Sequence, residues 1–109
     1  MTEITIYRNE NREVSRFTCI GHADFDEYGK DIVCASISVL VINTINAIES
    51  FTSCNFVCEA DEESGELDFS FADDITQDAS LLIDTMILGL QSIQESYGNE
   101  YIILKFKEV

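Results

Sequence analysis

Cys34 has the residue type and the sequence position that nucleophilic chemistry requires. An aspartate before an apolar run is a favoured helix N-cap, so a helix is expected to begin at Asp31 and to hold Cys34 in its first turn. The unpaired N–H groups and the positive end of the helix dipole there favour an anion such as a thiolate. The alternative is that Cys34 is a small apolar side chain in an apolar helix, and its position alone favours that interpretation.

His22 favours the interpretation that Cys34 is a reactive thiol rather than a structural side chain. It is the single histidine of the chain and lies between Gly21 and Gly29, in a loop that leads directly into the helix of Cys34. A strand–loop–helix unit brings the end of its loop back to the helix start. His22 and Cys34 are therefore expected to approach to about 3–3.5 Å, the contact that a thiolate–imidazolium pair for peptide-bond cleavage needs. The alternative is an exposed loop histidine, which leaves Gly21 unexplained.

Two further residues are candidates for supporting roles. Asp31 is expected mainly as the N-cap, but its carboxylate also fits the third member of a catalytic triad, which accepts a hydrogen bond from the imidazole. Ser38 follows Cys34 by four residues and lies on the same helix face. It either lines the pocket of the nucleophile or donates a hydrogen bond back to the carbonyl of Cys34.

The other cysteines, Cys19, Cys54 and Cys58, do not form a recognisable metal site. In a reducing cytosol disulfides are disfavoured, so each is core filler, metal ligand or reactive thiol. Cys54 and Cys58 are about 13 Å apart along a strand, too far to bind one ion together. Paired C-x-x-C knuckles, two-histidine helix motifs and phosphate or calcium loops are all missing from the sequence. We therefore expect no metal and no cofactor.

The chain is strongly acidic, with 21 Asp or Glu, 6 Lys or Arg and a formal net charge of −15. Nine acidic residues and no Lys or Arg lie between Glu59 and Asp78. Such a field repels nucleic acid and speeds encounters with basic partners. A solvated face that keeps the protein soluble is one interpretation, and a basic protein substrate or partner is the other. Direct binding to nucleic acid is not expected.

Length and composition predict one soluble domain over residues 1–109, with 46% hydrophobic and 25% charged residues. Ile32–Ile48 comes closest to the roughly 20 apolar residues of a membrane span, but Asn43 and Asn46 interrupt it. A buried helix is the better interpretation. The N-terminal residues lack the basic and apolar regions of a secretory signal, so we expect a cytoplasmic protein that does not bind membranes.

The pattern of elements predicts an α+β fold. Alternating apolar residues and intervening turn residues predict strands at 2–8, 14–20, 55–60, 66–71 and 100–107. Two longer periodic segments, ending near residues 51 and 97, predict helices. The order is β-β-α-β-β-α-β, which we interpret as a largely antiparallel sheet with two helices packed on one face.

The two predicted helices differ in their apolar faces. The first is apolar around most of its circumference, which predicts a place between the sheet and a second layer or a second subunit. The apolar residues of the second lie on one face: Ala79, Leu82, Ile83, Met86, Leu90, Ile93 and Tyr97. Asp74 with Gln77 resembles a capping box at its start, and Gly98 is expected to end it as the C′ residue.

The residues around His22 and Cys34 form a recognisable pattern. They are Gly21-His22-Ala23 and, after a short spacer, Gly29-Lys30-Asp31-Ile32-Val33-Cys34-Ala35-Ser36-Ile37-Ser38. This pattern resembles the signature of the ribosomal-processing cysteine proteases called Prp, which is roughly G-H-A, a spacer and G-x-D-I-V-C-A-A-V-S. Ser36 and Ile37 depart from it mildly, away from the candidate pair. Chain length and the β-β-α start agree too, so the resemblance covers essentially the whole chain.

The resemblance implies an activity. Members of that family remove a short N-terminal extension from a large-subunit ribosomal protein and are homodimeric. It therefore implies a cysteine endopeptidase that acts on a basic ribosomal protein, with Cys34 as nucleophile, His22 as general acid/base, and Asp31 and Ser38 in supporting roles. A homodimer suits the apolar first helix. Two other interpretations stay open: a non-catalytic acidic dimer that binds basic ribosomal proteins, and a thiol redox sensor, for which Cys34 needs a resolving partner.

Overall fold

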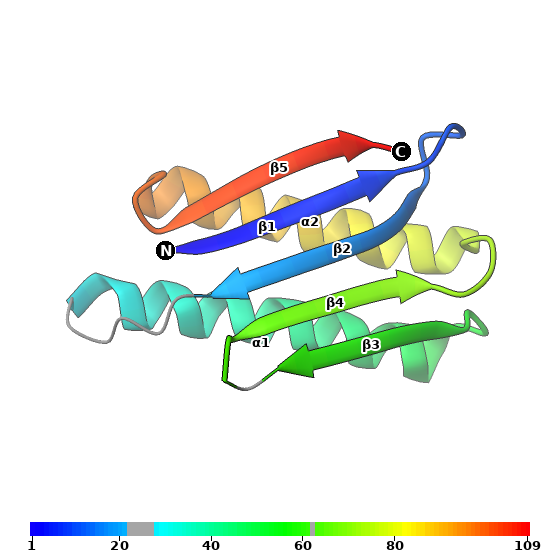
Figure 1. Cartoon of the computed structure of the whole chain (residues 1–109), viewed down its shortest axis with the longest axis horizontal. Helices are drawn as coiled ribbons and strands as arrows, with labels where there is room; N and C mark the ends of the chain where they lie inside the picture. The colour runs from blue at the N-terminus through cyan, green and yellow to red at the C-terminus, as the bar shows by residue number, and fades with distance from the viewer. Residues whose placement is uncertain (22–27, 62) are drawn as a thin grey trace.

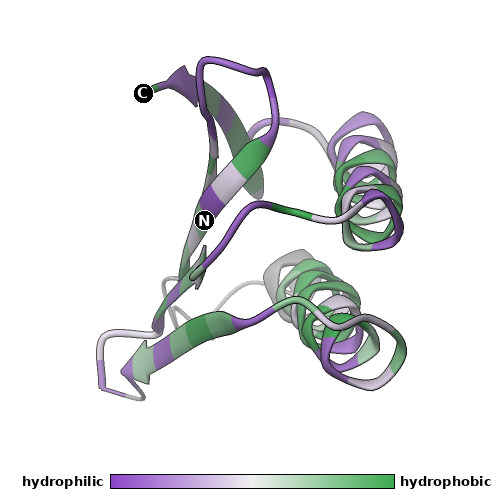
Figure 2. Cartoon of the chain, turned by 90° about the vertical axis from the view of Figure 1, so that its right-hand side faces the viewer, coloured by the Kyte–Doolittle hydropathy of each residue, from purple (hydrophilic) through white to green (hydrophobic). Residues whose placement is uncertain are grey.

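One five-stranded sheet has two long helices on one of its faces (Figure 1, Figure 2). The computed structural model describes residues 1–21, 28–61 and 63–109. Its elements are β1 (Thr2–Arg8), β2 (Val14–Gly21), α1 (Tyr28–Phe51), β3 (Phe56–Asp61), β4 (Glu66–Phe71), α2 (Gln77–Tyr97) and β5 (Ile102–Glu108). The predicted order of elements is confirmed, and β1 and β4 have the predicted bounds.

The strand order in the sheet is β3-β4-β2-β1-β5. β1 is antiparallel to β2 and parallel to β5, while β4 is antiparallel to both β2 and β3. α2 crosses the sheet to bring β5 beside β1, as Figure 1 shows. The largely antiparallel sheet is therefore confirmed, with β3 and β5 at its edges.

Side chains of alternate strand residues form the core between the sheet and the helices. Ile4 and Ile6 of β1, Phe17 of β2 and Phe69 of β4 are all fully buried. Figure 2 shows both helices on this side of the sheet and none on the other. Along β5, where inward side chains were expected throughout, burial falls toward the end of this edge strand, and Phe106 is 49% exposed.

α1 begins at Tyr28, three residues before the predicted start at Asp31. The N-cap assignment for Asp31 is therefore wrong, because Asp31 lies within the helix. Its sequence signal, an aspartate before an apolar run, marks where apolar periodicity begins. The helix itself begins before this apolar run, with the sequence Tyr28-Gly29-Lys30. Cys34 consequently lies beyond the first turn.

One side of α1 packs on the sheet, and another side is exposed to solvent. The buried side consists of Val33, Ile37, Val41, Thr44, Ile45 and Ile48. Four large apolar side chains on the remaining circumference are exposed: Ile32, Val39, Ile42 and Phe51. The apolar circumference is confirmed, and a covering second subunit stays a prediction. By length and composition, Ile32–Phe51 would also suffice to cross a membrane, a test that a core helix of a soluble protein passes equally.

Thr76 is the N-cap of α2. Its Oγ1 accepts a hydrogen bond from the N–H of Ala79 at 3.4 Å. The predicted capping box of Asp74 and Gln77 is wrong, because Gln77 is itself the first residue of the helix and Thr76 directly precedes it. Threonine is also a favoured cap residue, and the sequence analysis overlooked it at this position.

Gly98 ends α2 as predicted. Its φ of +91° lies in the region that favours glycine, and its N–H donates to the carbonyl of Gln94 at 2.8 Å. The apolar face of α2 is confirmed except at its end, where Tyr97 is 44% exposed.

Candidate active site

Cys34 lies on α1, next to the part of the helix that packs on the sheet. Its side chain is half-buried, between the fully buried Val33 and the exposed Ala35. Its Sγ is 3.6 Å from Oγ1 of Thr2, and either atom can be the donor of this hydrogen bond. The thiol is therefore partly open to solvent and also in contact with the sheet.

Thr2 is the first residue of β1, a strand that lies between β2 and β5 in the sheet. It pairs with Gly21, the last residue of β2, and with Ile102, the first residue of β5. Gly21 directly precedes His22 in the chain, while His22 itself lies outside the described residues. The Cys34 thiol thus contacts the strand that is paired with the residue before His22.

Cys19 of β2 is a second thiol close enough to Cys34 to interact with it electrostatically. Burial, and to a lesser extent the neighbouring Cys34, raise the pKa of Cys19 to about 11. Cys19 therefore stays protonated near neutral pH, and a thiolate is the nucleophilic form of cysteine. Of these two thiols, Cys34 is the better candidate nucleophile and Cys19 is core filler.

A cavity of about 400 Å³ opens between α1 and the sheet. The residues that line it come from α1, β2 and the β3–β4 hairpin: Cys19, Ser38, Val41, Ile42, Ala60, Asp61, Gly65, Glu66 and Leu67. We call it the inner cavity. Ser38 was expected either to line a pocket or to bond back along the helix, and it lies in this lining. The cavity begins one helical turn after Cys34, so its place suits a side chain of an extended substrate.

Because α1 begins earlier than predicted, the N–H groups that favour an anion belong to residues before Cys34. The N–H groups without an intrahelical partner are those of the first four residues of a helix, here 28–31. The prediction that Cys34 itself lies in this first turn is wrong, because α1 begins at Tyr28. Asp31 does lie there. Its side chain is outside the described part of the structure, so its role as a third catalytic member stays a prediction.

Gly65 connects the β3–β4 turn to the end of β2 through a backbone hydrogen bond. Its carbonyl accepts a hydrogen bond from the N–H of Gly21 at 3.3 Å. Its φ is +70°, and a Cβ at this position would lie 2.8 Å from the carbonyl oxygen of Gly21. A Cβ on Gly21, in contrast, would meet only Oγ1 of Thr2, at 3.9 Å. The turn therefore needs glycine at position 65, whereas position 21 has room for a methyl group.

The two glycines give a matched pair of substitutions. Gly65→Ala is expected to lower the free energy of unfolding by about 2 kcal/mol, because a positive φ and a contact with rigid backbone are both unfavourable. Gly21→Ala should change it by less than about 0.5 kcal/mol. Urea denaturation of both variants measures the difference. Equal destabilisation would contradict the close approach of Gly65 to Gly21.

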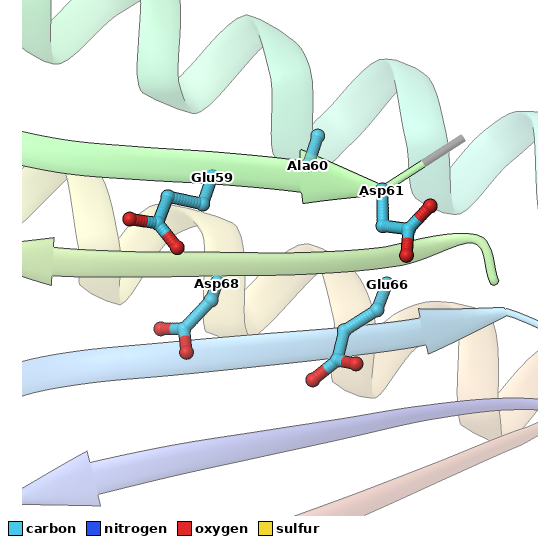
Figure 3. Close-up of a pocket in the computed structure, with 5 residues that line it drawn as sticks. All are labelled: Glu59, Ala60, Asp61, Glu66 and Asp68. Carbon is cyan, nitrogen blue, oxygen red and sulfur yellow. The ribbon is translucent and has the colours of Figure 1, made fainter. Parts of the chain in front are cut away.

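Four carboxylates lie together on the open face of the sheet, away from the helices (Figure 3). Glu59 is opposite Asp68, and Asp61 is opposite Glu66, on the paired strands β3 and β4. We call these four residues the acidic patch. Like charges directly opposite one another destabilise a sheet, so the patch does not serve the stability of the fold.

Arg16 of β2 neutralises one member of the patch. Its guanidinium donates to both carboxylate oxygens of Asp68, at 2.9 and 2.6 Å. This hydrogen-bonded pair holds the pKa of Asp68 below its usual value. The negative charge left on the patch therefore lies on Glu59, Asp61 and Glu66, and the last two residues also border the inner cavity.

Within residues 1–21, 28–61 and 63–109, the structure has no group of three or more His, Cys, Asp or Glu side chains arranged to hold a metal ion. The sequence analysis missed two residues that the structure brings to the site, Thr2 and Gly65. Gly65 had a signal, because it ends the turn of a predicted hairpin. Thr2 had none, since its contact with Cys34 depends on how α1 crosses the sheet.

The whole chain is similar to known cysteine proteases. A family model described as cysteine protease Prp matches residues 1–102. The ribosomal processing cysteine protease Prp of Staphylococcus aureus is 36% identical over 107 residues, which are 98% of this chain and 100% of that protein. The protein of the same name from Bacillus subtilis is 32% identical over 101 residues, 89% of this chain and 90% of the relative.

Solved structures agree with this similarity. The S. aureus protease in complex with a substrate peptide has a TM-score of 0.91 at 36% identity, covering 98% of this chain and 100% of that one. Its complex with a covalently linked product peptide has a TM-score of 0.87 over the same coverage. A Streptococcus mutans protein has a TM-score of 0.88 at 27% identity, covering 100% of this chain and 99% of that one. The fold, the whole-chain family match and these relatives together show that the chain belongs to the cysteine protease Prp family.

Proposed function

We propose that this chain is a cysteine endopeptidase that removes the N-terminal extension of a large-subunit ribosomal protein. Cys34 is the nucleophile and His22 the general acid/base. The observation that carries the proposal is the half-buried Cys34 thiol in contact with Thr2, whose strand partner Gly21 directly precedes His22. The relatives named ribosomal processing protease support the substrate class. A covalently linked product peptide on the S. aureus relative fits covalent catalysis.

The reaction proceeds in two steps. The Cys34 thiolate attacks the scissile carbonyl carbon, and a sulfur–carbon bond forms as the carbonyl becomes an oxyanion. His22 donates a proton to the departing amine, the carbon–nitrogen bond breaks and a thioester stays on Cys34. Water, losing a proton to His22, then hydrolyses the thioester and regenerates the thiolate.

The remaining polar groups take supporting roles in this proposal. The N–H groups of residues 28–31, which have no partner within α1, are the candidates for stabilising the oxyanion. Asp31 accepts a hydrogen bond from the His22 imidazole and orients it. Ser38 orients a substrate side chain in the inner cavity, whose lining it joins.

Charge complementarity supports a basic substrate. The chain has a net charge of −15, and Asp61 and Glu66 line the inner cavity next to the site. A field of one sign around a cleft raises the local concentration of an oppositely charged substrate. The acidic residues then act mainly on substrate capture, and direct binding of nucleic acid to this surface is disfavoured.

The double variant Asp61→Asn/Glu66→Gln is expected to lower kcat/KM for a basic substrate about three- to tenfold at low ionic strength, with kcat little changed. The difference from the unsubstituted protein should vanish near 1 M salt, where charges are screened within about 3 Å. Asp84→Asn/Glu95→Gln, on the exposed face of α2, removes the same charge elsewhere. If both double variants lose kcat/KM equally, net charge rather than the acidic residues at the cavity captures the substrate.

The proposal is tested with the purified chain and a large-subunit ribosomal protein that bears its N-terminal extension. Mass spectrometry of the products over time is expected to show one cut that releases the extension and leaves the mature protein intact. Site-resolved alkylation across pH should in parallel show Cys34 reacting faster than Cys19 and Cys58. An uncut extension together with a Cys34 thiol no faster than a free one would overturn the proposal.

We also infer that the protein acts as a homodimer in the cytoplasm. The observation that supports the dimer is the bare apolar side of α1, where Val39 is 69% and Ile42 51% exposed. Beside them a shallow cavity of about 440 Å³ is lined by Ala35, Ser36, Val39, Leu40 and Asn43. A second copy would bury this surface.

Neither alternative function gains support. Membership of a cysteine protease family disfavours a non-catalytic acidic module. A redox sensor would use Cys19 as the resolving thiol for Cys34, since the two interact electrostatically. With a pKa of about 11, Cys19 is protonated near neutral pH and attacks slowly.

A further inference from the structure

Thr2 places a hydroxyl group on an otherwise apolar stripe of β1. Its side chain is 3% exposed and lies on the same strand face as Ile4 and Ile6, which are fully buried. A valine would fill the same volume without a polar atom. Burying a hydroxyl is unfavourable unless it is hydrogen-bonded, and the partner that the structure provides is Sγ of Cys34 at 3.6 Å.

The hydroxyl is held in place by its strand. Thr2 pairs with Gly21 on one side and Ile102 on the other, and its N–H donates to the carbonyl of Tyr101 at 2.9 Å. A β-branched side chain also has few χ1 rotamers. The group that contacts the thiol is therefore fixed by the sheet.

The direction of this hydrogen bond depends on the state of the sulfur. While Cys34 is a thiol, either atom can donate. A thiolate has no proton and only accepts, so Thr2 must then donate. Hydrogen bonds to a charged group are about twice as strong as those between neutral groups. The contact consequently favours the thiolate over the thiol and restrains Sγ toward the sheet.

We propose that the Thr2 hydroxyl is the fixed hydrogen-bond donor that stabilises and aims the Cys34 thiolate. This inference rests on the proposed function, because it deepens the role of Cys34 as nucleophile. Thr2 keeps its proton throughout the reaction. As the sulfur–carbon bond forms, charge leaves the sulfur and the hydrogen bond weakens. Thr2 therefore helps to form and orient the nucleophile, and it contributes nothing to the oxyanion.

Several other described groups at this end of the sheet titrate or carry charge. Cys19 of β2 stays protonated below a pKa of about 11. Glu3 of β1 and Lys105 of β5 form an ion pair with each other at 2.6 Å, on the opposite face of the sheet from Thr2. Glu66 of β4 pairs with Ile20 of β2, and the amino group of Met1 directly precedes Thr2. The substitutions below leave these groups, His22 and Asp31 unchanged.

The test is Thr2→Val against Thr2→Ser. Loss of the donor in Thr2→Val should move the pH midpoint of Cys34 alkylation upward by about one unit, the effect of one hydrogen bond to an ionised group. kcat/KM should fall about tenfold at pH values below the alkylation midpoint and recover as the pH rises above it, with KM unchanged. Thr2→Ser keeps the hydroxyl and should stay within about threefold of the unsubstituted protein at every pH.

Thr5→Val is the matched control, since Thr5 is buried on the opposite face of the same strand. Thr2→Ala serves as a second donor-free variant if circular dichroism shows Thr2→Val unfolded. Unmoved alkylation midpoints, or equal shifts in Thr2→Val and Thr2→Ser, would overturn the inference. Cleavage by Cys34→Ala would instead overturn the proposed function, and the alkylation result for Thr2 would stand independently of it.

Discussion

Replacing Cys34 by alanine is expected to abolish removal of the N-terminal extension, lowering kcat/KM by about 10⁴-fold or more. The sulfur forms the covalent bond to the substrate, and among the described residues the neighbouring thiol does not replace it. Cys19, the thiol that interacts with it, is protonated near neutral pH because its pKa is about 11. Single-turnover reactions with excess enzyme, followed by mass spectrometry of the released extension, measure the loss.

The controls separate chemistry from folding. Cys58→Ala removes an exposed thiol on β3 and should leave kcat/KM within about twofold. His22→Ala should lower it by about 10²–10⁴-fold and flatten its dependence on pH, because the general acid/base is lost. Cys34→Ala should still bind substrate, since the substitution leaves the lining of the inner cavity unchanged. Cleavage by Cys34→Ala at more than about 1% of the normal rate would assign the nucleophile elsewhere.

The strands were predictable because their signals are local. Strict alternation in 2–8 and 66–71 gave both ends of β1 and β4, since turn residues flank these segments closely. The ends of β2, β3 and β5 shifted by one or two residues, where the pairing partner rather than the sequence sets the limit. The strand order needed contacts between distant segments, which no local pattern contains.

The helix starts were harder to predict, for a different physical reason. A cap is a backbone geometry, and several residues near a helix start are able to adopt it. For α2 the predicted cap was Asp74, but the cap is Thr76, two residues later. For α1 the apolar periodicity begins after Asp31, but the helical backbone begins at Tyr28. Apolar periodicity reports burial, and a helix also includes unburied turns.

The candidate nucleophile was predictable from its surroundings in the sequence, but its contacts were not. Cys34 stood out because an aspartate precedes it and a loop with the single histidine leads to it. Thr2 is 32 residues away, and its hydroxyl reaches the sulfur only because β1 pairs with β2 and α1 packs on that face of the sheet. Such a contact depends on both the sheet register and the placement of the helix. Neither can be predicted from a single segment of the sequence.

Phe69→Ala is expected to destabilise the protein by about 3–5 kcal/mol, because it empties the centre of an aromatic cluster. Phe69 is fully buried, and its ring centroid is 4.9 Å from Phe17, 4.8 Å from Phe56 and 4.9 Å from Phe71. These four rings join β2 to the β3–β4 hairpin. Because a domain of this size is stable by only about 5–15 kcal/mol, the loss removes a large part of its stability.

Urea denaturation measures the loss as a lower midpoint with an unchanged slope. Phe106→Ala is the matched control, since Phe106 is 49% exposed on the edge strand β5 and should cost less than about 1 kcal/mol. Phe69→Leu, which fills most of the space, should lie between them. The cluster supports one wall of the inner cavity, because Leu67 and Ala60 of the same hairpin line it. A Phe69→Ala protein as stable as Phe106→Ala would mean that the hairpin is held by its backbone pairing alone, and that the aromatic cluster does not fix the cavity wall beside Cys34.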